Sequence, residues 1–134
     1  MDKLDSKKIW HIVIMDKTEG PIISVPYEES VTDPDDIADL YTALTGFIGT
    51  QLYQITLEEK QYVFELGKRA IIAAGVEDLE NIQHCRDVLG RILIEFEFTY
   101  YERVRVSGKA PMLQEMEDMI RRYISDCMTR DFSA

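Results

Sequence analysis

The chain has 134 residues, 46% of them hydrophobic, and its 15 basic and 25 acidic residues give a formal net charge of −10. This length and apolar fraction predict one domain over residues 1–134 with a single packed core. The acidic excess argues against nucleic acid as a partner and leaves at most peripheral contact with a membrane. The apolar run near the N-terminus is too short for a signal peptide, and no stretch approaches the roughly 18 apolar residues of a membrane span. We therefore expect a cytoplasmic protein.

Two strand-like segments come first. Nearly every position from Lys8 to Met15 is apolar, which indicates a central strand covered on both faces. A turn over residues 16–20 leads to a second strand over residues 21–25, which Pro26 ends, so the two should form a hairpin. Strict alternation would place Trp10, Ile12 and Ile14 on one face of the first strand, and Ile9, Val13 and Met15 on the other.

A helix should follow, with Asp33 as its N-cap and Pro34 at the first helical position. Its apolar stripe consists of Ile37, Leu40, Tyr41, Leu44, Ile48 and Leu52. The alternation from Tyr53 to Leu57 then suits a half-exposed edge strand. The stripe and the edge strand together would border an apolar groove.

Two further strands complete the predicted sheet, over residues 61–66 and 69–74. Gly67 and Lys68 between them resemble a type II′ hairpin turn with Gly first. The small apolar residues of the last strand suit the middle of the sheet. Gly75 is best explained by a turn or a helix entry.

The second half of the chain predicts two helices. Asp78 can cap the first, and Ile82, Leu89 and Phe96 continue at heptad spacing. Residues 92–101 also alternate as a strand would, but the heptad step favours a helix there. Residues 104–109 break the helical pattern, and Pro111 opens a last helix. Its apolar stripe is Leu113, Met116, Met119 or Ile120, Tyr123 and Cys127.

Groups that could perform catalysis are sparse. His11 lies inside a strand, and His84 and Cys85 are adjacent on a helix, where neighbouring side chains diverge. These three residues, and Cys127 as well, are better explained as packed core groups. No metal-ligand spacing and no phosphate-binding loop is present in the sequence, so we predict no enzyme, no cofactor and no metal site. The alternative is a small hydrolase or transferase that uses Cys85 or His84.

Two sets of side chains in the C-terminal region could bind a partner. The methionines 112, 116 and 119 could form an adaptable apolar surface, but helical spacing favours core positions for them. A solvated face is the commoner explanation for the basic residues near the last helix, although they could also contact a membrane surface or an acidic partner. These residues are Arg103, Arg105, Lys109, Arg121 and Arg122.

The order β-β-α-β-β-β-α-α resembles that of longin domains, which occur in vesicle SNAREs, adaptor subunits, tethering complexes and activators of small GTPases. The segment over residues 88–100, with Phe96, Thr99 and Tyr100, is similar to the long helix of SNARE longins. Ala110-Pro111-Met112 before an amphipathic helix is similar to their final element. The resemblance covers roughly residues 8–128. No SNARE heptad region and no prenylation box follows, which argues against a fusogenic SNARE.

The resemblance implies an α+β fold with three layers: a five-stranded antiparallel sheet, one helix on one face and two on the other. It implies a non-catalytic scaffold in membrane trafficking or small-GTPase regulation. Its partners would be a small GTPase, another longin or roadblock domain, or a SNARE-like peptide, and a homodimer or heterodimer is compatible. The implied protein-binding groove maps to Leu44, Ile48, Tyr53, Ile55 and Leu57. A roadblock-like homodimeric regulator and a profilin-like small-molecule sensor are the alternatives.

Overall fold

The computed structural model describes residues 9–17, 20–27, 33, 36–39, 54–57, 60–76 and 82–133; for 54–57, 60, 82 and 127–133 only the backbone is described. Residues 36–39 form a helical turn. The strands are β1 (Ile9–Asp16), β2 (Gly20–Pro26), β3 (Gln54–Leu57), β4 (Lys60–Leu66) and β5 (Ala70–Val76). The helices are α2 (Ile82–Glu95), the π-helix η2 (Phe96–Tyr100), α3 (Tyr101–Ser107), the 3₁₀-helix η3 (Ala110–Met112) and α4 (Leu113–Ser133).

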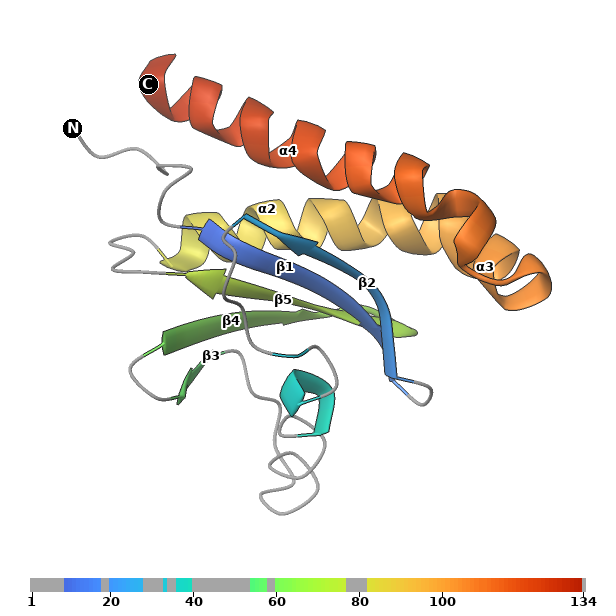
Figure 1. The fold of residues 1–134 in the computed structure, drawn as a ribbon. Helices are drawn as coiled ribbons and strands as arrows, with labels where there is room; N and C mark the ends of the chain where they lie inside the picture. The colour runs from blue at the N-terminus through green and yellow to red at the C-terminus, as the bar shows by residue number, and fades with distance from the viewer. Residues whose placement is uncertain are drawn as a thin grey trace.

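The strands form one antiparallel sheet in the order β2-β1-β5-β4-β3. The predictions of an α+β domain with an antiparallel sheet, of a β1–β2 hairpin and of central positions for β1 and β5 are confirmed. Helices α2 and α4 cover one face of the sheet, and the helical turn at residues 36–39 lies on the opposite side (Figure 1). The sheet therefore separates two apolar clusters.

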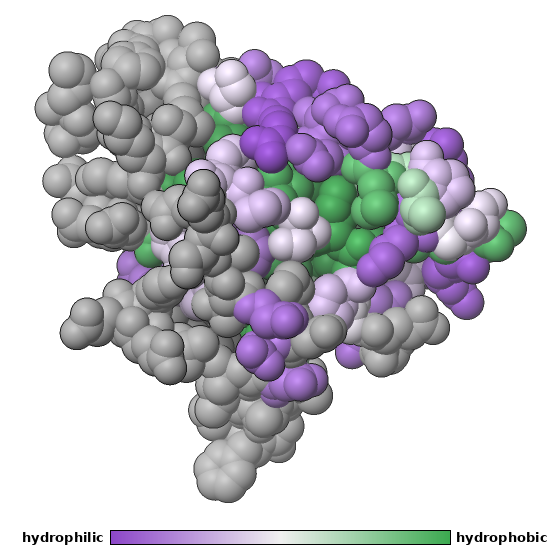
Figure 2. Space-filling model, in the orientation of Figure 1, coloured by the Kyte–Doolittle hydropathy of each residue, from purple (hydrophilic) through white to green (hydrophobic). Residues whose placement is uncertain are grey.

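The larger cluster lies between the sheet and the two long helices. It contains Ile12, Ile14, Ile72, Leu89, Ile92, Phe96, Met116 and Ile120, each at most 1% exposed. The predicted core positions of Met112, Met116 and Met119 are confirmed, since all three are buried. On the face seen in Figure 2, apolar side chains gather between the polar outer side of α4 and the β1–β2 hairpin.

The predicted division of the β1 side chains between two faces is wrong at its first two residues. Ile9 pairs with Val76 and His11 with Gly75, so Trp10 is an extra residue in the β1–β5 ladder. Such a bulge shifts the alternation by one position. Trp10 therefore packs with Val13 and Met15 in the smaller cluster around Ile37, whereas Ile9 joins the larger one.

Gly75 lies inside β5, not at a turn or helix entry as predicted from the sequence. A Cβ built on Gly75 would lie 2.8 Å from two carbons of the Trp10 ring. The indole therefore occupies the space that a side chain at this position would need. The bulge at Trp10 and the glycine opposite it form one packing unit.

The turn between β4 and β5 is one residue later than predicted. Leu66 pairs with Ile71, and the Gly67 N–H donates to the Ala70 carbonyl at 2.9 Å, so the two central residues are Lys68 and Arg69. Gly67 instead leaves room for the Glu97 carboxylate, because a Cβ at this position would lie 2.6 Å from Oε2 of Glu97. That oxygen accepts hydrogen bonds from the N–H groups of Arg69 (2.7 Å) and Ala70 (2.9 Å).

Glu97→Ala should destabilise the protein by about 1–2 kcal/mol, because three backbone N–H groups of the turn, those of Lys68, Arg69 and Ala70, lose their acceptor. Urea unfolding measures the change. Thr99→Ala, at an exposed position two residues along the same helix, is the control and should change the free energy of unfolding much less. Equal stabilities of the two variants would show that the carboxylate does not hold the turn.

Residues 92–101 are helical, so the helix favoured at this segment is confirmed. The predicted break at residues 104–109 begins too early, because α3 continues to Ser107 and ends where Gly108 adopts φ 82°. Within the helix the Tyr101 N–H donates to the Phe96 carbonyl, which is the π-type step. The inserted residue allows the adjacent Tyr100 and Tyr101 both to be buried, each 8% exposed.

Candidate binding surfaces

The groove implied by the family resemblance falls largely outside the described residues. Leu44, Ile48 and Tyr53 all lie there. Ile55 and Leu57 belong to β3, whose backbone alone is described and which pairs on one side with β4. The predicted edge position of this strand is confirmed by the sheet order. The groove itself remains a prediction.

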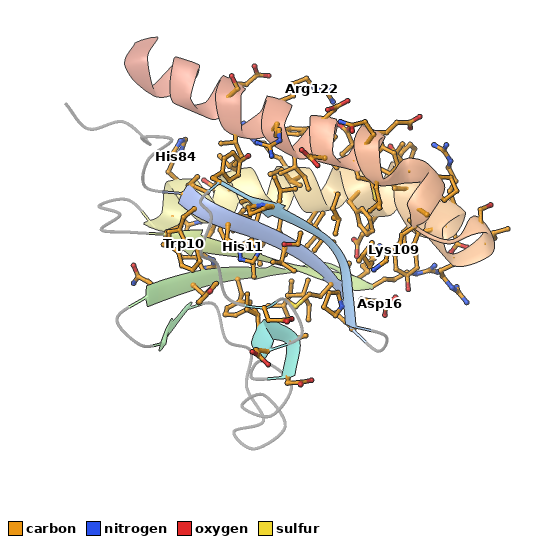
Figure 3. All side chains as sticks on the ribbon, in the orientation of Figure 1. Trp10, His11, Asp16, His84, Lys109 and Arg122 are labelled. Atoms are coloured by element: carbon orange, nitrogen blue, oxygen red, sulfur yellow. The ribbon has the colours of Figure 1, made fainter. Side chains whose placement is uncertain are left out.

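The two candidate catalytic residues, His84 and Cys85, are neighbours on α2. Cys85 is a buried thiol on α2, 1% exposed, and the neighbouring His84 is half-buried. Figure 3 places His84 at the opposite end of the sheet from Asp16 and Lys109. Within the part of the chain that the structure describes, no group of three His, Cys, Asp or Glu side chains could hold a metal ion.

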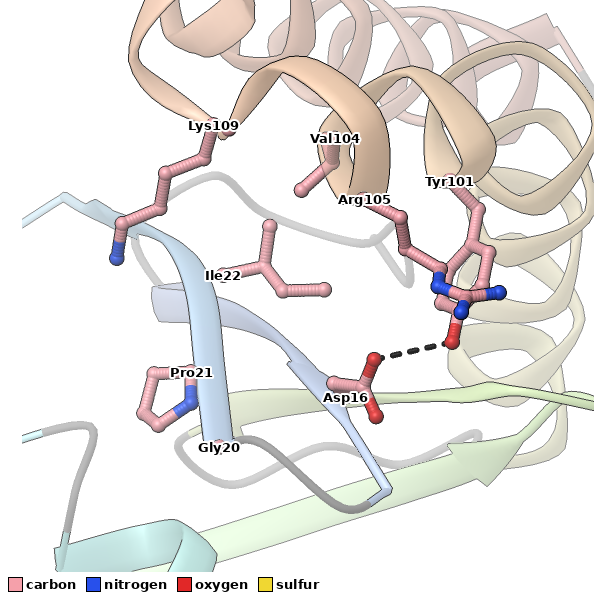
Figure 4. Close-up of a pocket in the computed structure, with 9 residues that line it drawn as sticks. Asp16, Gly20, Pro21, Ile22, Tyr101, Val104, Arg105 and Lys109 are labelled. Carbon is pink, nitrogen blue, oxygen red and sulfur yellow. Dashed lines mark hydrogen bonds between the residues drawn. The ribbon is translucent and has the colours of Figure 1, made fainter.

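An open pocket of about 250 Å³ lies between the β1–β2 turn and the α3–α4 connection. Pro21, Ile22 and Val104 supply its apolar wall, and Arg105 and Lys109 reach it from the helical side (Figure 4). One turn before Arg105 on α3, the Tyr101 hydroxyl donates to Oδ2 of Asp16 at 3.0 Å. The π-type step in the preceding helix helps to set the direction of Tyr101, so the helix irregularity and the pocket are connected.

The electrostatics of the pocket centre on Tyr101. Burial raises the pKa of its hydroxyl, and the hydrogen bond to Asp16 and the carboxylate charge act in the same direction. The nearby guanidinium groups of Arg105 and Arg69 oppose this rise in pKa. Arg69 also lies over the Tyr101 ring, 5.2 Å from its centroid. The phenol therefore stays neutral near pH 7 and acts as a hydrogen-bond donor.

Tyr101→Phe should lower the free energy of unfolding by about 1 kcal/mol, because Asp16 loses a partly buried hydrogen bond while the ring packing is kept. The matched control is Tyr100→Phe, the neighbouring and equally exposed tyrosine, for which no hydroxyl hydrogen bond is present among the described residues. Urea unfolding of both variants provides the comparison. A loss no larger for Tyr101→Phe than for Tyr100→Phe would contradict the assigned hydrogen bond.

The predicted basic cluster does not form one continuous surface of unpaired charge. Arg121 pairs with Glu117 at 2.8 Å and Arg122 with Glu95 at 3.4 Å. Looser contacts join Arg103 to Glu115 at 3.9 Å and Arg105 to Glu102 at 3.8 Å. Only Arg105 and Lys109 of the five line the pocket. The observed ion pairs favour the solvated-face explanation for the others.

A second surface, which was not predicted from the sequence, lies on the outer side of the long helix. Ile94 is 70% exposed and Phe98 is 91% exposed, and Val106 farther along is 82% exposed. Ile94 and Phe98 are four residues apart, so their side chains neighbour each other on the helix, and we call them the exposed apolar face. Neither residue belongs to the buried stripe of Leu89, Ile92 and Phe96. This difference in helical position could have indicated their exposure from the sequence.

No family model matches the chain, and no curated protein matches it. Within the described residues, no helix combines the length and apolar character that crossing a membrane requires.

Proposed function

We propose that this chain is a non-catalytic protein-interaction scaffold. The observation that carries the proposal is the exposed apolar face, because two large side chains at 70% and 91% exposure face solvent on a helix whose other side is well packed. A fully hydrated Phe beside an Ile contributes nothing to the core. Covering both with a partner would remove apolar surface from water, at about 25 cal/mol per Å².

We further propose that the scaffold is of the longin type. The strand order β2-β1-β5-β4-β3, with α2 and α4 on one side and the helical turn at residues 36–39 on the other, supports this assignment. The three-layer arrangement with a single first helix, the role in vesicle trafficking or small-GTPase regulation and the cytoplasmic location belong to the same proposal. Its partners are a small GTPase, another longin or roadblock domain, or a SNARE-like peptide.

A binding panel tests this function. The purified chain is immobilised and exposed to small GTPases loaded with GDP or a GTP analogue, to longin and roadblock domains, and to SNARE-like peptides. The expected result is saturable binding of at least one class, which is lost in Phe98→Asp or in the combined Tyr53→Lys, Ile55→Asp variant. Val106→Asp controls for added charge at an exposed apolar position on α3. Binding that both surface variants leave unchanged would contradict the assigned surfaces.

The pocket favours a second candidate function, the sensing of a small molecule. Its apolar wall and the two cations Arg105 and Lys109 suit a ligand with an apolar body and an anionic end. Its volume of about 250 Å³ is below the usual range for small-molecule sites, so we rank this function second. A shift in melting temperature caused by a carboxylate library, lost in Lys109→Ala, would favour it; no shift with any member would argue against it.

A further inference from the structure

We propose that the exposed apolar face binds a second copy of this chain, with the two long helices antiparallel across a twofold axis near Phe96. This inference rests on the proposed interaction function and specifies its partner. Around such an axis Ile94 of one copy meets Phe98 of the other, and each contact occurs twice. Both side chains are exposed in the single chain, so pairing requires no rearrangement of the core.

The exposed charges along this helix are self-complementary in this register. Asp87 lies nine residues before Phe96 and Arg105 nine residues after it, so antiparallel pairing brings these opposite charges toward each other. Arg91 and Glu102, five residues before and six after, match in the same way. All four side chains are exposed. In a parallel pairing, each charged residue would instead lie opposite the same residue of the second copy, and like charges repel each other.

The local partners of these charges do not block the pairing. Asp87 accepts a hydrogen bond from the exposed Gln83. Arg105, which also borders the pocket, contacts Glu102 at 3.8 Å. Glu102 also pairs with Arg69, at 53% and 64% exposure of the two side chains. Exposed ion pairs of this kind are worth little and exchange partners readily. The Asp87 and Arg105 match is therefore the better one to test.

Two crossing helices cover less than the roughly 1,600 Å² of a standard interface, so the dimer should be weak, with a dissociation constant on the order of 100 μM. Sedimentation equilibrium from about 10 μM to about 1 mM covers this range. The wild-type chain should change from monomer to dimer within it. A monomer throughout would overturn the proposal.

Substitutions test the surface and the register. Phe98→Asp should weaken self-association at least about tenfold, because it removes the central aromatic contact and buries a charge. Val106→Asp, at a position that is also apolar and exposed but eight residues farther along, should weaken it less than about threefold. Equal effects of the two would overturn the assigned centre. Both positions are exposed, so circular dichroism should show intact folds.

A charge exchange tests the antiparallel arrangement. Asp87→Arg and Arg105→Asp should each weaken the dimer about threefold to tenfold, since symmetry uses every pair twice. The double variant should recover wild-type association, and failure to recover would overturn the register. If the chain is monomeric yet Phe98→Asp abolishes binding in the partner panel, this inference fails while the proposed function stands. If Phe98→Asp changes neither self-association nor partner binding, the exposed apolar face takes part in neither.

Discussion

Gly75→Ala is expected to lower the free energy of unfolding by about 1–3 kcal/mol, although alanine normally stabilises a strand relative to glycine. The cause is the Trp10 ring, because the added Cβ would lie 2.8 Å from two of its carbons. Trp10 is 3% exposed and also contacts Tyr62 edge-on, with ring centroids 5.2 Å apart. The indole therefore has little room to move away.

A double-mutant cycle isolates this contact. In a Trp10→Leu background, itself destabilised by several kcal/mol, Gly75→Ala should cost close to nothing because the ring is gone. Gly90→Ala on α2 is the control: its nearest contact is 3.8 Å away, so it should stabilise the protein by up to about 1 kcal/mol. An undiminished cost of Gly75→Ala in the Trp10→Leu background would contradict the packing unit.

Acidification should destabilise the fold through His11. Burial lowers the pKa of this histidine from 6.5 to about 4, and its side chain is fully buried. Nε2 lies 2.7 Å from the Ser24 hydroxyl in a hydrogen bond, whereas Nδ1 has no hydrogen-bond partner among the described residues. Trp10 stacks beside the ring, with centroids 5.9 Å apart (Figure 3). A proton on this ring would place an uncompensated charge in the core.

The sign of the pH effect follows from the order of the two pKa values. The unfolded chain takes up the proton near pH 6.5 and the folded chain only near pH 4, so the folded state loses stability as the pH falls between these values. Between pH 7 and pH 4.5 the loss should be about 2 kcal/mol. Urea unfolding at the two pH values measures it. His11→Gln should reduce the loss by most of that amount, and an unchanged pH dependence would contradict the assignment.

Much of the fold could be predicted from the spacing of apolar residues along each strand and helix. The apolar run of β1 predicted a central strand, and the heptad step from Leu89 to Phe96 correctly favoured a helix over a strand. Such patterns report which side of an element is buried. They do not report an inserted residue, and for that reason the bulge at Trp10 and the π-type step at Phe96 were missed.

The candidate surfaces depended on information that the local sequence does not carry. The pocket joins Asp16 to Tyr101, and only the folded topology brings these residues together. The sequence placed Gly67 in the turn because residue preferences for turns take no account of a distant side chain. In the folded chain the Glu97 carboxylate, from a helix far along the sequence, lies against Gly67. The exposure of Phe98 was predictable in part, since the residue lies outside the buried stripe that was recognised.

The solvent accessibility of residue 98 in solution tests most directly whether the exposed apolar face binds a protein. A 4-fluorophenylalanine at this position gives a ¹⁹F signal whose relaxation by a soluble nitroxide measures exposure. We expect strong relaxation in the dilute chain and clear protection at high concentration or with a partner from the binding panel. Strong relaxation under every condition, in a sample that does bind its partner, would contradict the claim that this helix face is a protein-binding surface.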